Sequence, residues 1–168
     1  MNRLLPMVGL LLVVTAHPAG QSARTPEEQV IAIALNTAIG ERAIPDFDLA
    51  VQEGHLVLRD SAAVATEPVT MLAIREELLP SVDGLKIDRL PMPKIRDKAE
   101  HGPAFVYLTV LKLEVHGSEA FATVSAGWMV GKNRKQNYVP PGASGIRLRM
   151  VRQEGAWKLD KIVERWTS

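Results

Sequence analysis

Cysteine is absent from the 168-residue chain, which excludes disulfide bonds and lipid attachment through a cysteine. Aromatic residues are scarce at 5%, so the hydrophobic share of 46% consists mainly of aliphatic side chains. The fold must therefore depend on an aliphatic core, and a chain of this length can bury enough surface for one. The composition predicts an ordinary globular domain.

The short motifs that identify common catalytic sites are also missing. The sequence contains no HExxH, no G-x-S-x-G and no phosphate-binding glycine loop. After residue 23 the histidines are His55, His101 and His116, and no two of them lie within four positions of each other. We therefore expect neither a metal ion nor a cofactor.

Long apolar runs are limited to the N-terminus. A basic start, Met1 to Arg3, precedes an apolar stretch from Leu4 to Val14, and small or polar residues follow. This order is typical of a secretory signal peptide, and the stretch is shorter than the about 20 residues that span a bilayer. We expect residues 1–23 to be removed and the rest to be periplasmic or secreted, without a transmembrane segment. An uncleaved N-terminal anchor is the alternative.

An excess of charge is missing as well. Residues 1–23 contain Arg3 and no acidic residue, so 19 basic and 19 acidic residues remain after their removal. A balanced chain gives no support for nucleic acid as a partner.

Residues 24–168 are predicted to form a single α+β domain in which N-terminal helices pack on a curved antiparallel sheet. The first helix has a clear start, because Thr25 suits the N-cap, Pro26 suits the first helical position and Glu28 completes a capping box. Apolar residues recur on one side of this helix as far as about Ile39.

Short elements are expected next. Residues 45–51 are consistent with one helical turn, and residues 55–59 alternate like a strand. A small-residue loop, 60–66, follows that strand. Residues 85–88 resemble a brief edge strand.

A second helix is predicted after Thr66, with Met71, Ile74 and Leu78 on its buried face. Prolines and charges dominate the stretch 91–103, which we therefore interpret as a loop.

The C-terminal part is predicted to form long antiparallel strands at 104–117, 118–131, 145–155 and 156–166, with a loop at 131–145. Alternation predicts that Ile146, Leu148 and Met150 point to one face of the sheet and Arg147 and Arg149 to the other.

The last hairpin, whose residues 154–162 read EGAWKLDKI, resembles the C-terminal hairpin of NTF2-like (SnoaL/ketosteroid-isomerase-like) proteins. The order of helices and strands is similar to that family too. The resemblance implies a cone-like sheet wrapped around helices, with a small ligand or an active site in its concave mouth. Catalytic members use a carboxylate base with a Tyr and a protonated acid. Tyr107 lies on the predicted sheet, but no carboxylate here matches the base.

Three residues are candidates for acid–base catalysis, namely His55, Asp60 and Tyr107, with Asp46 and Asp48 as further carboxylates. In the simpler interpretation His55 is a polar cap, Asp60 belongs to a turn, and Asp46 and Asp48 cap a helix.

Four residues are candidates for ligand binding, namely Tyr107, Trp128, Arg147 and Arg149. The tryptophan is suited to lining a pocket for a flat apolar molecule, and the arginines to binding an anion or an acidic partner. The alternatives are a tryptophan that fills the core and a solvated sheet face whose arginines pair with acidic residues on neighbouring strands.

These patterns favour an exported, non-catalytic protein that binds a small apolar or anionic molecule or serves as an accessory to a protein partner. Two alternatives stay open. One is a small isomerase or hydrolase with its acid–base group in the cone, and the other is a dimeric interaction module joined through the exposed sheet face.

Overall fold

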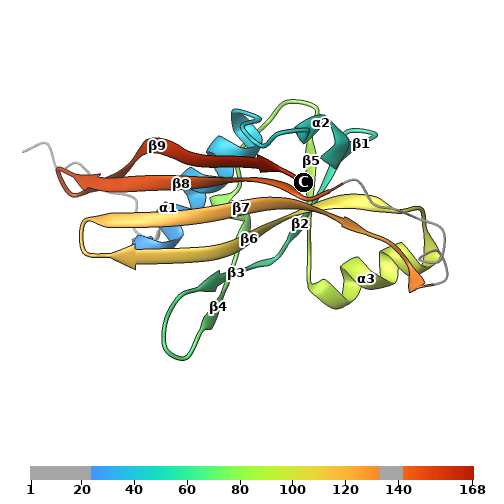
Figure 1. The fold of residues 1–168 in the computed structure, drawn as a ribbon, viewed down its shortest axis with the longest axis horizontal. Coiled ribbons are helices and arrows are strands. Elements are labelled where there is room, and N and C mark those ends of the chain that lie inside the picture. Colours follow the sequence, from blue (N-terminus) through green and yellow to red (C-terminus); the bar gives the residue numbers. More distant parts are fainter. Residues whose placement is uncertain (1–23, 133–141) are drawn as a thin grey trace, which may run out of the picture.

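The computed structural model of the chain describes residues 24–132 and 142–168. The predicted signal peptide and most of the predicted loop 131–145 lie outside the described residues. The described part contains helices and nine strands, shown in Figure 1. The helical elements are α1 (Pro26–Leu35), η1 (Asn36–Gly40), α2 (Phe47–Ala50), η2 (Glu76–Leu78) and α3 (Met92–His101). The strands are β1 (Val51–Gln52), β2 (His55–Arg59), β3 (Ser61–Val64), β4 (Thr70–Ala73), β5 (Lys86–Leu90), β6 (Phe105–His116), β7 (Glu119–Met129), β8 (Ser144–Gln153) and β9 (Ala156–Thr167).

The fold is α+β, as predicted, with a strongly curled mixed sheet that resembles half a barrel. The main strand order is β1-β2-β6-β7-β8-β9, while β5 pairs with β2, and β3 pairs with both β4 and β6. In Figure 1, α1 lies behind β6, β7 and β8. We call the sheet face that packs on α1 the inner face and the opposite one the outer face.

The predicted C-terminal meander is confirmed. Each of the strands β6 to β9 pairs antiparallel with the next. Gly117 and Gly155 occupy the two tight turns with φ of 59° and 83°, a backbone conformation that glycine adopts without steric cost.

Among the N-terminal strands β1–β2 and β3–β4 pair antiparallel, but the prediction of an antiparallel sheet is wrong for other pairs. β2 pairs parallel with both β5 and β6. Parallel neighbours need long crossover connections, and the chain supplies them. The β3–β4 excursion and η2 connect β2 to β5, and α3 connects β5 to β6.

The predicted start of α1 is confirmed in detail. The Thr25 hydroxyl accepts a hydrogen bond from the Glu28 N–H (3.2 Å), and the Glu28 carboxylate accepts one from the Thr25 N–H (2.9 Å). The helix continues through the π-helical turn η1 to Gly40, close to the predicted end.

The predicted second helix and the loop before it are wrong. Residues 61–64 and 70–73 form the β3–β4 hairpin instead. Met71, expected on a buried helix face, is 50% exposed. Ile74 and Leu78 are buried as predicted, but they follow the hairpin and do not lie on a long helix. Ile74 directly follows β4, and Leu78 is the last residue of η2.

The predicted loop at 91–103 is also wrong, because it contains α3. Pro91 occupies the N-cap position and Pro93 lies in the first turn, where a missing N–H costs no helical hydrogen bond. Ile95 and Ala99, four residues apart, are buried on one side of the helix.

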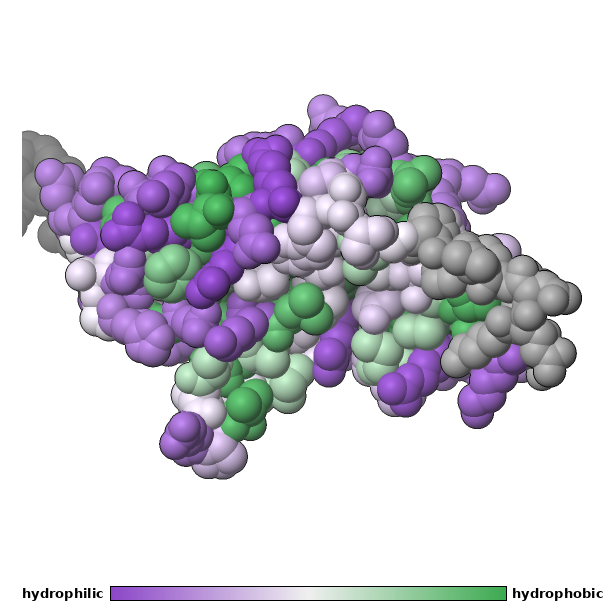
Figure 2. All heavy atoms as spheres, viewed as in Figure 1, coloured by the Kyte–Doolittle hydropathy of each residue, from purple (hydrophilic) through white to green (hydrophobic). Residues whose placement is uncertain are grey.

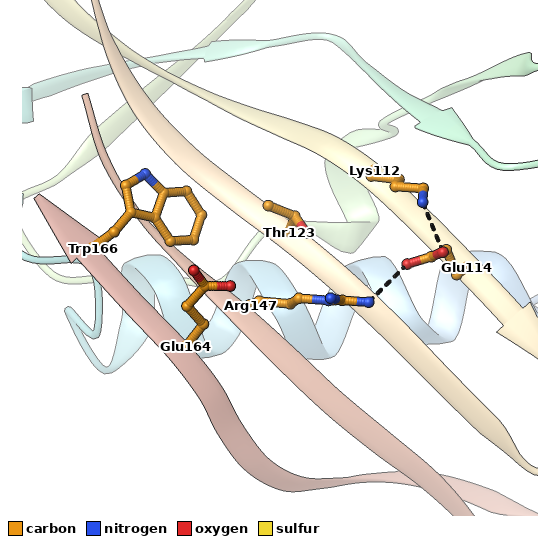
Figure 3. A pocket seen from close by; sticks show the side chains of 6 residues that line it. All are labelled: Lys112, Glu114, Thr123, Arg147, Glu164 and Trp166. Carbon is orange, nitrogen blue, oxygen red and sulfur yellow. Dashed lines mark hydrogen bonds and ion pairs between the residues drawn. The ribbon is translucent and has the colours of Figure 1, made fainter. Parts of the chain in front are cut away.

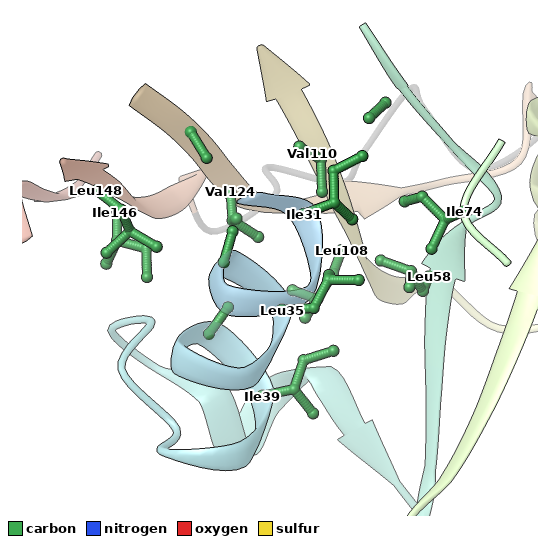
Figure 4. Packing of buried hydrophobic residues seen from close by; sticks show 14 of the residues in the cluster. Ile31, Leu35, Ile39, Leu58, Ile74, Leu108, Val110, Val124, Ile146 and Leu148 are labelled. Carbon is green, nitrogen blue, oxygen red and sulfur yellow. The ribbon is translucent and has the colours of Figure 1, made fainter. Parts of the chain in front are cut away.

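The main core lies between α1 and the inner face (Figure 4). Ile31 and Leu35 of α1 are fully buried and point toward side chains of β6. On β7, the inner positions include three alanines, which allow the helix to lie close to the middle of the sheet. The three residues that alternation placed on one face, Ile146, Leu148 and Met150, all belong to this core. The β7 residues Ala120, Ala122, Val124 and Ala126 belong to it as well.

A smaller core lies on the outer face, under α3. Val57 and Phe105 from the sheet pack with Ile95 and Ala99 from the helix. No helix within residues 24–132 and 142–168 has the length and apolar character needed to cross a bilayer.

Candidate functional site

The structure separates two of the three catalytic candidates, His55 and Asp60. His55 begins β2 and Asp60 directly follows its last residue, so they are about 16 Å apart along an extended strand. Tyr107 lies on β6, where it pairs with Val57. Its ring lies against Gly127, and a Cβ atom added to that glycine would be 3.6 Å from the ring.

The ligand-binding candidates also do not form one site. On β6, Tyr107 pairs with Gly127 of β7, and the preceding residue, Val106, pairs with Trp128. Because side chains alternate, Trp128 lies on the inner face beside the main core and Tyr107 lies on the outer face. Arg147 pairs with Thr123, four residues from Gly127 and therefore about 13 Å away along β7.

Arg147 does take part in a hollow of about 420 Å³ on the outer face. We call it the outer-face trough, and Figure 3 shows its lining: Lys112, Glu114, Thr123, Arg147, Glu164 and Trp166. Most charges in the trough neutralise each other. Glu114 accepts hydrogen bonds from Lys112 Nζ (2.8 Å) and from Arg147 Nη2 (3.2 Å).

The other arginine candidate is paired as well. Arg149 donates to Glu119 on β7 and to Asp160 on β9, the latter at 2.8 Å. The guanidinium of Arg147 additionally lies 4.9 Å from the centroid of the Phe121 ring. Figure 2 shows hydrophilic side chains gathered over the β8–β9 end of this face. The arrangement matches the alternative of a solvated, ion-paired sheet face.

The ion pairs in the trough give the protein a specific pH dependence. The hydrogen bond from Lys112 has the largest effect on Glu114 and lowers the pKa of its carboxyl, although partial burial raises it. A carboxyl whose pKa is lower in the folded state stabilises the fold above its unfolded pKa of about 4.3, and this stabilisation disappears as the pH falls through the folded pKa.

We therefore expect Glu114→Gln to lower the free energy of unfolding by about 0.5–1 kcal/mol at pH 7. The difference from the unsubstituted protein should shrink below about pH 4.3 and vanish in stronger acid. Urea unfolding at a series of pH values measures it. Glu164→Gln is the matched control, because Glu164 makes no ion pair within the described residues; its effect at pH 7 should be smaller. A pH-independent effect of Glu114→Gln would contradict the expectation.

A second hollow, of about 620 Å³, lies at the beginning of β6. We call it the β2–α3 cleft, and its lining residues are Ala50, Gln52, Glu53, His55, Val57, Lys98, Pro103, Phe105 and Val106. Its floor is apolar, because it contains the side chains of Val57 and Phe105, which are 5% and 2% exposed, and the exposed Pro103 lines the cleft as well. The polar lining residues are mostly at the exposed rim.

Two rim residues have defined contacts. The Lys98 ammonium lies 5.6 Å from the centroid of the Phe105 ring. His55 Nδ1 lies 3.4 Å from Asp88 Oδ2, and Lys86 Nζ lies 3.3 Å from Asp88 Oδ1. Burial of Asp88 raises the pKa of its carboxyl, but the hydrogen bonds from His55 and Lys86 and the Lys86 charge together outweigh it, so the pKa is lowered.

Sequence reasoning identified only His55 among the polar residues of this cleft. Lys98 was assigned to a loop, so its position on a helix, three residues after the buried Ile95, was missed. The spacing of Ile95 and Ala99 was the available signal. Within residues 24–132 and 142–168, no group of three or more His, Asp or Glu side chains is arranged to hold a metal ion.

Comparison with known proteins does not assign the chain to a family. No family model matches it, and no curated protein and no solved structure matches it either. The NTF2-like resemblance therefore stays a prediction, and the molecular class is defined only by the α+β fold with its half-barrel sheet.

Proposed function

We propose that this chain is an exported, non-catalytic binding protein of NTF2-like fold that holds a small organic molecule in the β2–α3 cleft. The observation that carries the proposal is the combination of an apolar floor and a polar rim in a hollow of about 620 Å³. Small-molecule sites have volumes of roughly 300–1,000 Å³, mostly apolar walls and a few polar groups that orient the ligand.

The position of the cleft differs from the concave mouth implied by the family resemblance. Side chains of α1 and η1 fill the inner face, and Ile31 and Leu35 of α1 and Ile39 of η1 are completely buried. The cleft instead lies where β2, α2 and α3 meet the beginning of β6. The curled sheet around a helix supports the family proposal, and the N-terminal pattern of residues 1–23 supports export.

A non-catalytic role fits the distribution of acid–base groups. An enzyme of the isomerase or hydrolase type needs its catalytic groups within hydrogen-bond reach of one substrate. His55 and Asp60 are about 16 Å apart, and the His55 imidazole is engaged by Asp88 at a half-exposed position. The binding function therefore has better geometric support than the catalytic alternative.

Nuclear magnetic resonance tests the proposal directly. Titration of ¹⁵N-labelled protein with a panel of small aromatic acids, alcohols and amides should shift amide resonances of Val57, Phe105 and Val106. The substitution Gln52→Trp, at an exposed position on the rim, should fill the cleft and abolish these shifts.

Gln153→Trp is the matched control, because Gln153 is an exposed residue at the far end of β8. It should leave binding unchanged. Shifts confined to the outer-face trough, or shifts that survive Gln52→Trp, would refute the proposed site.

A further inference from the structure

The charges around the β2–α3 cleft are not equally available to a ligand. Asp88, next to the cleft, already contacts both His55 and Lys86. Lys98 differs, because its ammonium makes no ion pair or hydrogen bond within the described residues and contacts only the face of Phe105. A cation at the edge of an apolar floor is the feature that a ligand can use.

The acidic residues nearest to Lys98 in the sequence interact with other groups. Asp97 contacts His101 at 3.3 Å, one helical turn further on. Glu100 accepts two hydrogen bonds from the Lys132 N–H, at 2.8 and 2.9 Å. The helix therefore leaves the Lys98 charge uncompensated.

The other charged group on the rim is Glu53, which has a positive φ of 51° in the turn between β1 and β2. It makes no ion pair within the described residues, and it would repel an anion. An anionic group is therefore favoured at the Lys98 end of the cleft and disfavoured at the Glu53 end.

The donor set also limits the kind of anion. Phosphate and sulfate are bound preferentially by arginine forks or by several backbone N–H groups, whereas one ammonium is a single point charge. The polar groups that line the cleft include one lysine and no arginine. A monoanion with an apolar body fits this lining best.

We infer that the β2–α3 cleft takes a small organic acid, its single carboxylate held by Lys98 and its apolar body packing against Pro103 above the floor that contains Phe105 and Val57. This inference rests on the proposed binding function. It adds the ligand class and assigns Lys98 as the residue that selects the charge.

A pair of isosteric probes tests it, 3-phenylpropanoate and the uncharged 3-phenylpropanamide, titrated in low salt against ¹⁵N-labelled protein. We expect the carboxylate to bind about 5–10-fold more tightly than the amide. Lys98→Gln should reduce the affinity for the carboxylate to that for the amide and leave the amide unaffected. Glu53→Gln should increase the affinity for the carboxylate.

Lys94→Gln is the matched control, because Lys94 is exposed on the same helix one turn earlier and does not line the cleft. It should change neither affinity, and each variant should keep the melting temperature of the unsubstituted protein. Equal binding of acid and amide, with no effect of Lys98→Gln, would overturn the inference and leave the binding function standing. Failure of both probes to shift cleft resonances would overturn both.

Discussion

Replacement of Ile31 by Ala is expected to lower the free energy of unfolding by about 2–5 kcal/mol. Ile31 is completely buried and points from α1 toward Val110 and Leu108 on β6 (Figure 4). Removing its outer carbons leaves a cavity between helix and sheet that neither element can close without moving. Because the chain contains no cysteine, no disulfide limits the resulting loss. Urea unfolding followed by circular dichroism measures it.

Ile33→Ala is the matched control for this substitution. The residue type and the helix are the same, but Ile33 is only partly buried and lines a groove beside Trp157 on β9. We expect a loss of about 1 kcal/mol or less. Equal losses at the two positions would show that α1 does not pack on the inner face with the side that contains Ile31.

The predictability of this chain follows from how local each signal is. The four C-terminal strands were predicted correctly because each is long and most of them alternate apolar and polar residues. The turns and the loop that link them are rich in glycine. The start of α1 was predicted because its capping box needs only four consecutive residues. Elements that are long, or that begin with a capping motif, can therefore be predicted from their own residues.

The errors occur where a local signal has two physical interpretations. Pro91 and Pro93 suggested a loop, but proline is also favoured in the first turn of a helix. Met71, Ile74 and Leu78 have helical spacing, yet their segment forms an edge strand and a single 3₁₀ turn. Neither ambiguity can be resolved without knowing which sheet edge or face is available for packing.

The site was less predictable than the fold, because it is assembled from distant segments. His55 and Lys98 line one cleft although 43 positions separate them in the sequence. This proximity depends on the parallel pairing of β2 with β6 and on α3, both of which sequence reasoning missed. Arg147 and Arg149, in contrast, were placed on the correct face because alternation within one strand is a local property.

Gly145→Ala is expected to destabilise the protein by about 1–3 kcal/mol through overpacking. Gly145 pairs with Trp166 on β9, and a Cβ atom at this position would lie only 2.2 Å from the indole ring. The same atom would lie 2.7 Å from the carbonyl oxygen of Val124. The ring could rotate away, but the backbone of β7 lies in the middle of the sheet, so relief requires a shift of paired strands.

The measurement combines urea unfolding with the indole N–H resonance of Trp166, which should move because its ring lines the outer-face trough. Gly127→Ala is the matched control, since the added carbon would meet only the Tyr107 ring at 3.6 Å, an ordinary contact. Alanine restricts the unfolded chain more than glycine, so Gly127→Ala should be neutral or stabilising by up to about 1 kcal/mol. Equal destabilisation at both positions would mean that any side chain on these strands is harmful, and the close packing of Trp166 on Gly145 would then not be the cause.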